Sequence, residues 1–334
     1  MTIDCHTHWV SPALADALRQ RTVPPRIETL ADGTERFHLP VGFLKFGPEY
    51  IDINARIAFM DGLGIRKQML SFPGLFGVDS LAIGEAEPLL VPFNDDLAAL
   101  CRSHPDRFCG LAALPFADMD RAVAEYIRAR TELGLIGAIL PNNGFLSIAE
   151  AEKFKPILKA AQDYGGHLFI HPGRRPDQVP ADPGKAPPFP FPDTVLHRQA
   201  LSVQHDVANC MTTLLFSDIL DAYPDVSVHV ANLGGTLPMV VERMDHVIRL
   251  RTDNELLPSS RLRRVHVDCS SLGPRSIEIA VAMYGADRIV FGTDCPIFRT
   301  DWSLEAVRAA KITELEREQI FYRNAEALLA AAVR

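Results

Sequence analysis

The stretch TIDCHTH, residues 2–8, is short, rich in β-branched residues and carries two histidines one residue apart. In a β-strand, residues i and i+2 point to the same side, so His6 and His8 share one face while Cys5 and Thr7 share the other. Two imidazoles on one buried face cost desolvation free energy unless something binds them, and a metal ion is the usual partner. A single His-x-His pair is weak evidence, so this interpretation depends on what the rest of the chain supplies.

Seven further apolar, β-branched runs recur along the chain, and stretches with helical spacing lie between them. These predicted strands are KQMLSF (67–72), FCGLAALP (108–115), GAILP (137–141), HLFIHPG (167–173), VSVHVAN (226–232), RVHVDCS (264–270) and RIVFGTD (288–294). Strands that alternate with helices predict βαβ units and a parallel sheet, and eight is the number that closes a (β/α)8 TIM barrel. A doubly wound open sheet is the alternative, although no G-x-G-x-x-G motif follows any of these strands. We therefore predict an α/β fold with a single TIM-barrel domain over residues 1–334.

The segments between the strands contain recognisable helices and two exceptions. Helical spacing predicts helices over residues 122–134 and 151–166, and Thr313 with Glu316 forms a capping-box signal near the C-terminus. Residues 22–50 have a weak hairpin-like pattern and are predicted to be a small insertion after the first strand. Residues 172–192 contain eight prolines, which exclude sheet or helix interior and predict a stiff loop, either a surface crossover or a lid beside the active site.

Composition excludes several classes of function. The chain of 334 residues carries a net charge of −8, and both nucleic acids and anionic membranes need a basic surface to bind. The six cysteines include no C-x-x-C pair, which is typical of reduced thiols in a cytosolic protein. The N-terminus does not resemble a signal peptide, and no apolar run approaches the roughly 18 residues that a membrane span requires. We therefore predict a cytoplasmic protein that binds neither nucleic acid nor membrane.

Two more predicted strands end in residues that bind metals. His171 closes HLFIH and Asp294 closes RIVFGTD, so both lie at the carboxyl ends of parallel strands, where TIM-barrel active sites are built. Three neutral imidazoles and one carboxylate suit zinc, and manganese accepts the same set. We predict one divalent metal ion held by His6, His8, His171 and Asp294.

The order of these motifs resembles a known family. His-x-His on the first strand, F-I-H-P on the fifth, G-G-x-x-P after the sixth and F-G-T-D on the eighth are similar to the amidohydrolase superfamily, and more narrowly to its α-amino-β-carboxymuconate-ε-semialdehyde decarboxylase branch. The similarity covers nearly the whole chain, including residues 94–115 and 320–329. It implies the same four ligands chosen above, a small carboxylic acid as substrate and a homodimer.

One position departs from the pattern of that branch. Its decarboxylases have a histidine just before the glycine pair that follows strand six, whereas here VHVANLGGTLP places Asn232 there. His229 lies three residues earlier and would face the opposite way on a regular strand. Asn232 can donate and accept hydrogen bonds but cannot titrate near pH 7. Either Asp294 carries the proton transfer alone, or the reaction differs.

Two arginines are predicted to bind the substrate. Arg243 aligns with an arginine that binds the substrate carboxylate in the decarboxylase branch and can do so across a dimer interface; the alternative is a surface ion pair with Glu242 or Asp245. Arg174 opens the proline-rich loop and is placed to meet an anion. Asp268, at the end of strand seven, could orient a ligand or a water, while His167 is predicted to be a buried, hydrogen-bonded histidine.

Three functional hypotheses remain. The first is a metal-dependent carboxy-lyase, a non-oxidative decarboxylase acting on a small aromatic or unsaturated carboxylic acid, with Asp294 and Asn232 as its catalytic residues. The second is a metal-dependent hydrolase or hydratase that uses the same site on a C–C, ester, lactone or amide bond. The third is a barrel that binds a metal or an organic acid without turning it over.

Overall fold

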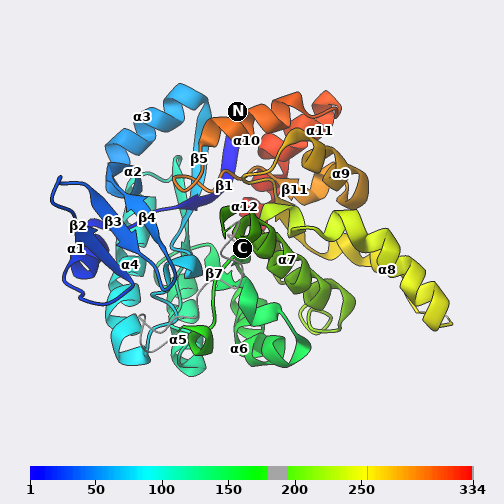
Figure 1. The fold of residues 1–334 in the computed structure, drawn as a ribbon, viewed down its shortest axis with the longest axis horizontal. Coiled ribbons are helices and arrows are strands. Elements are labelled where there is room, and N and C mark those ends of the chain that lie inside the picture. Colours follow the sequence, from blue (N-terminus) through cyan, green and yellow to red (C-terminus); the bar gives the residue numbers. More distant parts are fainter. Residues whose placement is uncertain (180–194, 254, 333–334) are drawn as a thin grey trace.

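The computed structural model describes residues 1–179, 195–253 and 255–332, and its centre is an eight-stranded parallel sheet (Figure 1). The strands are β1 (Thr2–His8), β5 (Ile65–Ser71), β6 (Phe108–Ala112), β7 (Gly137–Pro141), β8 (His167–His171), β9 (Ser227–Val230), β10 (His266–Asp268) and β11 (Ile289–Val290). Each strand pairs with the next in this order. The sheet closes because Cys5 N donates to Phe291 O at 2.8 Å and His8 N donates to Cys295 O at 2.7 Å. The predicted TIM barrel is confirmed.

Helices follow the strands and surround the barrel. They are α1 (Pro12–Arg19), α2 (Pro48–Ile51), α3 (Ile53–Leu63), α4 (Ile83–Ser103), α5 (Met119–Thr131), α6 (Ile148–Tyr164), α7 (Val195–Phe216), α8 (Leu237–Arg251), α9 (Pro274–Tyr284), α10 (Thr300–Ala309), α11 (Glu314–Glu318) and α12 (Asn324–Ala332). The two predicted helices begin three residues earlier than expected because Asp118 and Ser147 cap α5 and α6. The capping box of Thr313 and Glu316 is confirmed. None of the helices in the described residues is long and apolar enough to cross a membrane.

The predicted insertion forms a small antiparallel sheet beside the mouth of the barrel. Its strands are β2 (Arg26–Thr29), β3 (Glu35–His38) and β4 (Phe43–Phe46). Phe37 of β3 is fully buried, and its ring lies 4.8 Å from that of Phe76, which follows the carboxyl end of β5. Phe76 in turn lies 6.1 Å from the His8 ring, so the insertion packs next to the predicted metal site.

The proline-rich segment lies mostly outside the part of the chain that the structure describes. Of the residues predicted to form this loop, only 172–179 are described. Within them, Pro176–Gln178 forms one short 3₁₀ turn, η3.

Six of the eight barrel strands end earlier than the sequence pattern predicts, whereas β1 and β7 end where expected. β9 stops at Val230 and is followed by the short 3₁₀ turn η6 (Asn232–Gly234), and β11 contains only Ile289 and Val290. The residues beyond these strand ends, including Asn232 and Asp294, belong to the loops that form the mouth. The side chains of the polar residues in these loops are therefore available for a site, while the backbone after β11 still hydrogen-bonds to β1, for example from Asp294 N to His6 O at 2.8 Å.

The apolar core has two layers. The larger cluster fills the space between the strands and the surrounding helices, and the smaller one lies inside the barrel around residues such as Ile3, Leu111 and Phe169. Leu328 of α12 packs into the inner cluster, and Asn324 of the same helix donates to the carbonyl of Ile289 at the start of β11. α12 therefore covers the amino end of the barrel and leaves the carboxyl end for the site.

Candidate metal centre

Four side chains meet at the carboxyl end of the barrel. β1 supplies His6 and His8, β8 ends on His171, and the loop after β11 contributes Asp294. All four are buried, and one ligand atom from each lies within 4.8 Å of the other three. The structure thus brings together the four residues that the sequence pattern selected, in an arrangement that could hold a metal ion.

The outer nitrogens of two of these histidines are tied to acceptors. Nδ1 of His171 donates to the carbonyl oxygen of Pro172 at 2.8 Å. Nδ1 of His8 lies 3.1 Å from the hydroxyl of Ser71, and that hydroxyl gives its own proton to the carbonyl of Thr7. Both imidazoles are therefore protonated at Nδ1, which leaves the lone pair of each Nε2 directed to the centre.

His6 is held in the same way by a carboxylate. Its Nδ1 donates to Oδ2 of Asp268 at 3.0 Å. A metal-bound histidine usually donates its second ring N–H to a carboxylate or a carbonyl, which fixes the ring and raises its basicity as a ligand. His171 has a carbonyl partner of this kind and His8 has a hydroxyl, so the Nδ1 of all three imidazoles is engaged.

The inner nitrogens provide the test of whether a cation fits. Nε2 of His6 and Nε2 of His171 are buried and have no hydrogen-bond partner in the described residues. Nε2 of His8 lies 2.9 Å from Oδ1 of Asp294, and Nε2 of His6 lies 3.5 Å from the same oxygen. Three lone pairs around one carboxylate oxygen suit a divalent ion, which would satisfy the two orphaned nitrogens.

The charges of the site point the same way. Burial lowers the pKa of His6, but the carboxylates of Asp268 and Asp294 outweigh it and raise that pKa to about 10. Burial lowers the pKa of His8, and burial together with the neighbouring imidazoles brings the pKa of His171 well below its usual value. For Asp294, burial raises the pKa, but the two histidines of β1 outweigh it and hold that pKa below its usual range. The pocket keeps its carboxylates ionised and attracts positive charge.

Backbone geometry at Asp294 and Gly292 is adapted to the site. Asp294 has a φ of 61°, in the left-handed region that is uncommon for non-glycine residues, and such strain clusters at functional sites. A Cβ at Gly292 would lie 2.8 Å from Cβ of His6 and 3.0 Å from Cβ of Asp268. The glycine of F-G-T-D therefore lets the chain pass close to the pair that orients the ligand.

The strand alternation predicted for residues 226–232 is wrong at its carboxyl end. β9 ends at Val230, and Asn232 has a φ of 58° in the turn that follows. Residue 232 is therefore outside the strand, and the carboxylate of Asp268 accepts from both His229 and Asn232. The donors are Nε2 of His229 at 3.1 Å and the backbone N–H of Asn232 at 3.3 Å.

The side chains of His229 and Asn232 are nevertheless used differently. Nδ1 of His229 lies 2.8 Å from Nε2 of His167, so both of its ring nitrogens are engaged and neither is left for a substrate. The side-chain oxygen of Asn232 accepts from the hydroxyl of Ser270 at 3.2 Å, while its amide nitrogen makes no hydrogen bond within the described residues. Asn232 has a donor to offer, and His229 does not.

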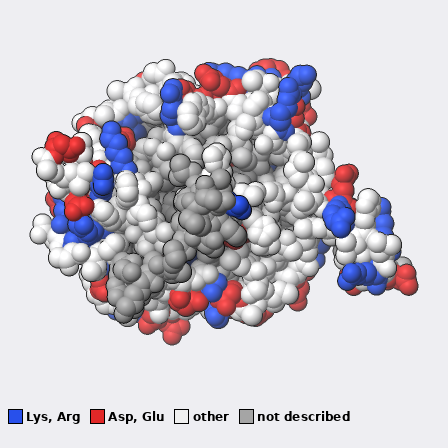
Figure 2. All heavy atoms as spheres, in the orientation of Figure 1, with Lys and Arg blue, Asp and Glu red and all other residues white. Residues whose placement is uncertain are grey.

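The two predicted substrate arginines lie in different places. Arg174 is half-buried three residues after His171, and its guanidinium makes no hydrogen bond or ion pair within the described part of the chain. Arg243 is exposed on α8, which extends away from the barrel and carries both acidic and basic side chains at its outer end (Figures 1 and 2). Asp245, its alternative partner, instead accepts from the backbone of Ser259 at 3.0 Å.

Ser71 is a partner of the site for which the sequence carries no local signal. It ends β5 and lies opposite His8 because β1 and β5 pair in parallel register. Their separation of 63 residues leaves no local signal. Only the order of strands around a closed barrel could have suggested that a polar residue at the end of the second predicted strand meets His8.

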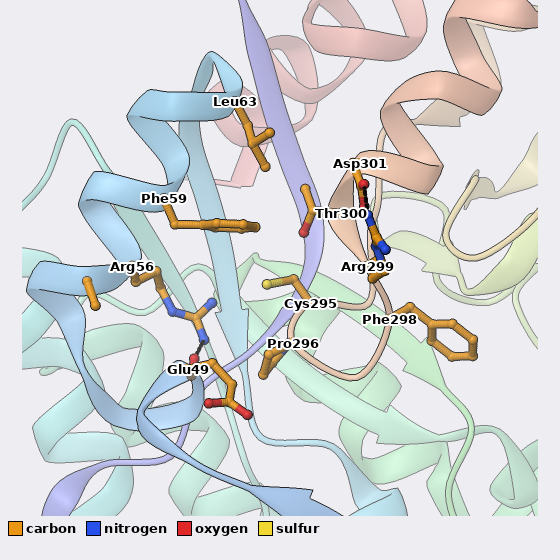
Figure 3. A pocket seen from close by; sticks show the side chains of 11 residues that line it. Glu49, Arg56, Phe59, Leu63, Cys295, Pro296, Phe298, Arg299, Thr300 and Asp301 are labelled. Carbon is orange, nitrogen blue, oxygen red and sulfur yellow. Dashed lines mark hydrogen bonds and ion pairs between the residues drawn. The ribbon is translucent and has the colours of Figure 1, made fainter.

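A separate cavity lies outside the barrel wall. It has a volume of about 540 Å³ and lies between α3 and the loop that follows Asp294, with Phe59 and Phe298 on its walls (Figure 3). Arg56 lines it and donates to the carbonyl of His8 at 2.7 Å. None of the four residues of the metal centre is among the described residues that line it, so this cavity is distinct from the centre.

A buried carboxyl near the mouth gives a prediction about stability. Burial raises the pKa of Asp79 from 3.8 to about 7, and the hydroxyl of Ser80 is its side-chain partner at 3.1 Å. Because the unfolded state releases this proton first, the native state loses stability as the pH rises from about 4 to 7 and loses no more above that range. We expect Asp79→Asn to raise the free energy of unfolding by about 2–4 kcal/mol at pH 8 and to have little effect at pH 4.

The measurement for Asp79 is thermal unfolding of wild type and variant at both pH values. The control is Asp163→Asn, at an exposed carboxylate paired with Lys159. Its effect on the melting temperature should be the same at pH 4 and pH 8. An equal effect of Asp79→Asn at pH 4 and pH 8 would contradict the assignment.

Comparisons with known proteins agree with this geometry. A family model described as Amidohydrolase matches residues 3–330. Gamma-resorcylate decarboxylase from Rhizobium radiobacter is 27% identical over 292 residues, covering 82% of this chain and 86% of its own. The 2-amino-3-carboxymuconate-6-semialdehyde decarboxylase from Dictyostelium discoideum is 26% identical over 251 residues, covering 73% and 67%.

A solved structure shares the fold. It is dihydroxybenzoic acid decarboxylase from Polaromonas sp. JS666 with bound manganese and the inhibitor 2-nitroresorcinol. Its TM-score is 0.71 at 21% identity, with 98% of this chain and 96% of that chain covered.

Proposed function

The chain belongs to the amidohydrolase family, and on that premise we propose that it is a metal-dependent carboxy-lyase acting on a small aromatic or unsaturated carboxylic acid. The observation that carries the proposal is the centre at the barrel mouth, where three imidazoles with fixed Nδ1–H groups surround Asp294. Relatives that align with most of the chain are decarboxylases of such acids. The reaction is non-oxidative.

The metal we propose is zinc. His6, His8, His171 and Asp294 would hold it, and three imidazole nitrogens with one carboxylate oxygen suit this ion. Manganese accepts the same set and is bound in the Polaromonas relative. When bound, the ion would supply a Lewis acid that draws electron density from the carboxylate region of the substrate. Metal content of protein purified without chelators distinguishes the two ions.

Asp294 is the proposed proton carrier. The bond between the carboxylate carbon and its neighbour breaks, the electron pair stays on the neighbouring carbon, and that carbon takes a proton from Asp294 as CO₂ leaves. Because the two histidines hold the pKa of Asp294 below its usual range, the side chain is ionised before substrate arrives. The proton that it delivers must first come from the substrate, which favours acids with a hydroxyl beside the carboxylate.

Asn232 is proposed to orient the substrate without moving a proton. Its side-chain oxygen is occupied by Ser270, which leaves the amide N–H groups as donors. An amide donor suits a carbonyl or carboxylate oxygen and stays uncharged at any pH at which the protein is folded. The exchange of the branch's histidine for Asn232 is also the observation that favours the hydrolase or hydratase alternative.

Arg174 is proposed to pair with the substrate's carboxylate. Burial lowers the pKa of this guanidinium, while Asp206 partly offsets that effect, so the side chain stays charged. We expect Arg174→Met to raise KM about tenfold or more and to change kcat less, because a charge-assisted bond is lost in ground and transition states alike. The matched control is Arg175→Met, whose guanidinium pairs with Glu150 and Asp177. An unchanged KM in Arg174→Met contradicts the role.

We further propose a homodimer formed through α8, with Arg243 reaching the partner's site. Met239 is 68% exposed and Leu250 is 84% exposed on this helix, which is unfavourable in a monomer. Leu250→Asp should give a monomer in light scattering, while Leu315→Asp, at a 61% exposed leucine of α11, should not. Wild-type protein that is monomeric at micromolar concentration contradicts this interface.

The proposed location is the cytoplasm. All six cysteines are unpaired, and five of them are buried. Reduced cysteines of this kind are typical of cytosolic proteins.

The experiment that tests the function is CO₂ release by metal-loaded protein over a panel of hydroxybenzoates and muconate-type acids. Mass spectrometry of the same reactions identifies the product. A product lighter by one CO₂ supports the carboxy-lyase. A product heavier by one water, or two fragments, replaces it with the hydrolase or hydratase. Metal and acid bound with no turnover across the panel favours a binding protein.

A further inference from the structure

A continuous row of hydrogen bonds leads from the metal centre into the interior of the barrel. Nδ1 of His6 and Nε2 of His229 both form hydrogen bonds with Oδ2 of Asp268, at 3.0 and 3.1 Å. Nδ1 of His229 then meets Nε2 of His167 at 2.8 Å, and Nδ1 of His167 meets the hydroxyl of Ser227 at 2.9 Å. The three histidines and the aspartate have no exposed surface.

The row has only one consistent direction of donors. Asp268 accepts four hydrogen bonds, because Oδ1 also receives the backbone N–H groups of Asn232 and Ser270. A carboxylate saturated in this way stays ionised and acts only as an acceptor. His229 must therefore carry its proton on Nε2, which leaves its Nδ1 as an acceptor for Nε2–H of His167.

The far end of the row agrees with this direction. With Nε2–H given to His229, the Nδ1 of His167 is an acceptor and receives the hydroxyl proton of Ser227. Burial lowers the pKa of both histidines, so each stays neutral with one proton on one nitrogen. Every ring nitrogen and carboxylate oxygen between Nδ1 of His6 and the hydroxyl of Ser227 therefore has a hydrogen-bond partner.

Ring packing keeps the row rigid. Phe169 stacks on His229 with centroids 3.9 Å apart and 10° between the planes, and its ring also meets His6 edge-on at 4.8 Å. His167 and His229 are parallel at 5.1 Å. Parallel pairing of β8 with β9 places His167 opposite Ser227 and Phe169 opposite His229, so the sheet register itself positions the row.

We propose that His229 and His167 are positioning residues for the metal centre. They fix Asp268 in the orientation that occupies Nδ1–H of His6, and so keep Nε2 of His6 directed to the ion. The inference rests on the proposed function only in taking that Nε2 as a ligand. By this proposal, the metal centre depends on His167, which lies at the amino end of β8, at the opposite end of the same strand from His171.

The physical reason is the cost of the alternatives. Without a donor from His167, Nδ1 of His229 is a buried acceptor with no partner, which is unfavourable. If His229 instead moved its proton to Nδ1, the lone pair of Nε2 would face the carboxylate of Asp268. In either case the hydrogen bond from His229 to Asp268 is weakened. Asp268 is then held less firmly in the orientation in which it accepts from Nδ1 of His6.

Metal affinity of His167 variants tests this role. His167→Phe keeps a flat ring but removes both nitrogens, and we expect it to weaken zinc binding about tenfold, as for other outer partners of metal ligands. His167→Gln retains a donor near the Nε2 position, so its zinc affinity should stay within about twofold of that of the wild type. Dissociation constants come from competition with a chromophoric chelator.

A matched control separates positioning from general destabilisation. Asn324→Ala removes a buried side chain that donates to Ala286 and Ile289 at the same end of the barrel, outside the row. It should lower the melting temperature without changing zinc affinity. Equal loss of affinity in the His167→Phe and Asn324→Ala variants, or unchanged affinity in His167→Phe, overturns the proposal.

A second measurement does not need metal or activity. Long-range ¹H–¹⁵N correlation in histidine-labelled, metal-free wild type should find His229 and His167 protonated only at Nε2. Protonation of either one at Nδ1 overturns the proposal, even if the His167→Phe variant fails to fold. If the wild type binds no metal while both tautomers are as expected, the proposed function fails and the direction of the row stands.

Discussion

Replacement of Asp294 by alanine should lower turnover by at least about 10³–10⁴-fold at saturating substrate and metal, because this one side chain is proposed to be both metal ligand and proton carrier. Its Oδ1 lies 2.9 Å from Nε2 of His8 and 3.5 Å from Nε2 of His6, and among the described residues it is the one carboxylate in the cluster of possible metal ligands. Asp268, the nearest alternative, already accepts four hydrogen bonds and cannot turn toward the substrate. The measurement is the steady-state rate of CO₂ release.

A second substitution separates the two proposed roles of this side chain. Asp294→Asn keeps an oxygen for the metal but cannot carry a proton, so we expect it to retain bound metal and still lose about 10²–10⁴-fold in kcat. Glu125→Gln is the control, since Glu125 is equally buried and pairs with Arg128 far from the centre. A near-normal rate in Asp294→Asn would show that the proton comes from another group.

Much of the fold could be predicted because the barrel repeats one local pattern. Each strand is a short apolar run, and the capping box at Thr313 marks the start of α11 in the sequence, whereas the cap at Ser147 was not recognised. The strand ends were harder to predict, because apolar side chains continue past the last paired residue. β9 ends at Val230 and β11 ends at Val290. The backbone beyond each strand leaves the extended conformation, with positive φ angles at Asn232 and Asp294.

The four residues at the centre of the site were predictable for the same local reason, since each lies at or near the end of a predicted strand. Their partners were not. Ser71 reaches His8 through pairing of strands 63 residues apart, and Asp268 reaches His6 across the closed barrel. The separate prediction that His229 faces away from Asn232 assumed a regular strand through residue 232, and the early end of β9 removes that assumption. Interactions between strands depend on register, which one sequence does not encode locally.

Removal of the metal is the second change with a large expected effect. Dialysis against a chelator should abolish turnover, and one equivalent of zinc or manganese should restore it, because the ion is proposed to supply the Lewis acid of the reaction. The apoprotein should also be less stable. A ligand present at a hundred times its dissociation constant adds about 2.7 kcal/mol to the free energy of unfolding. Calorimetric melting of chelated and reloaded protein measures this difference.

The control for metal removal is His171→Ala. Nε2 of His171 is buried without a partner in the described residues, so the imidazole costs desolvation in the apoprotein and gains only when a cation binds. The variant should therefore melt near the temperature of chelated wild type and show no rise on addition of zinc. His104→Ala, at a histidine of the exposed loop before β6, should respond to zinc as wild type does. If chelated wild type keeps its rate and its melting temperature, the cluster of His6, His8, His171 and Asp294 is not a metal centre, and the carboxy-lyase proposal falls with it.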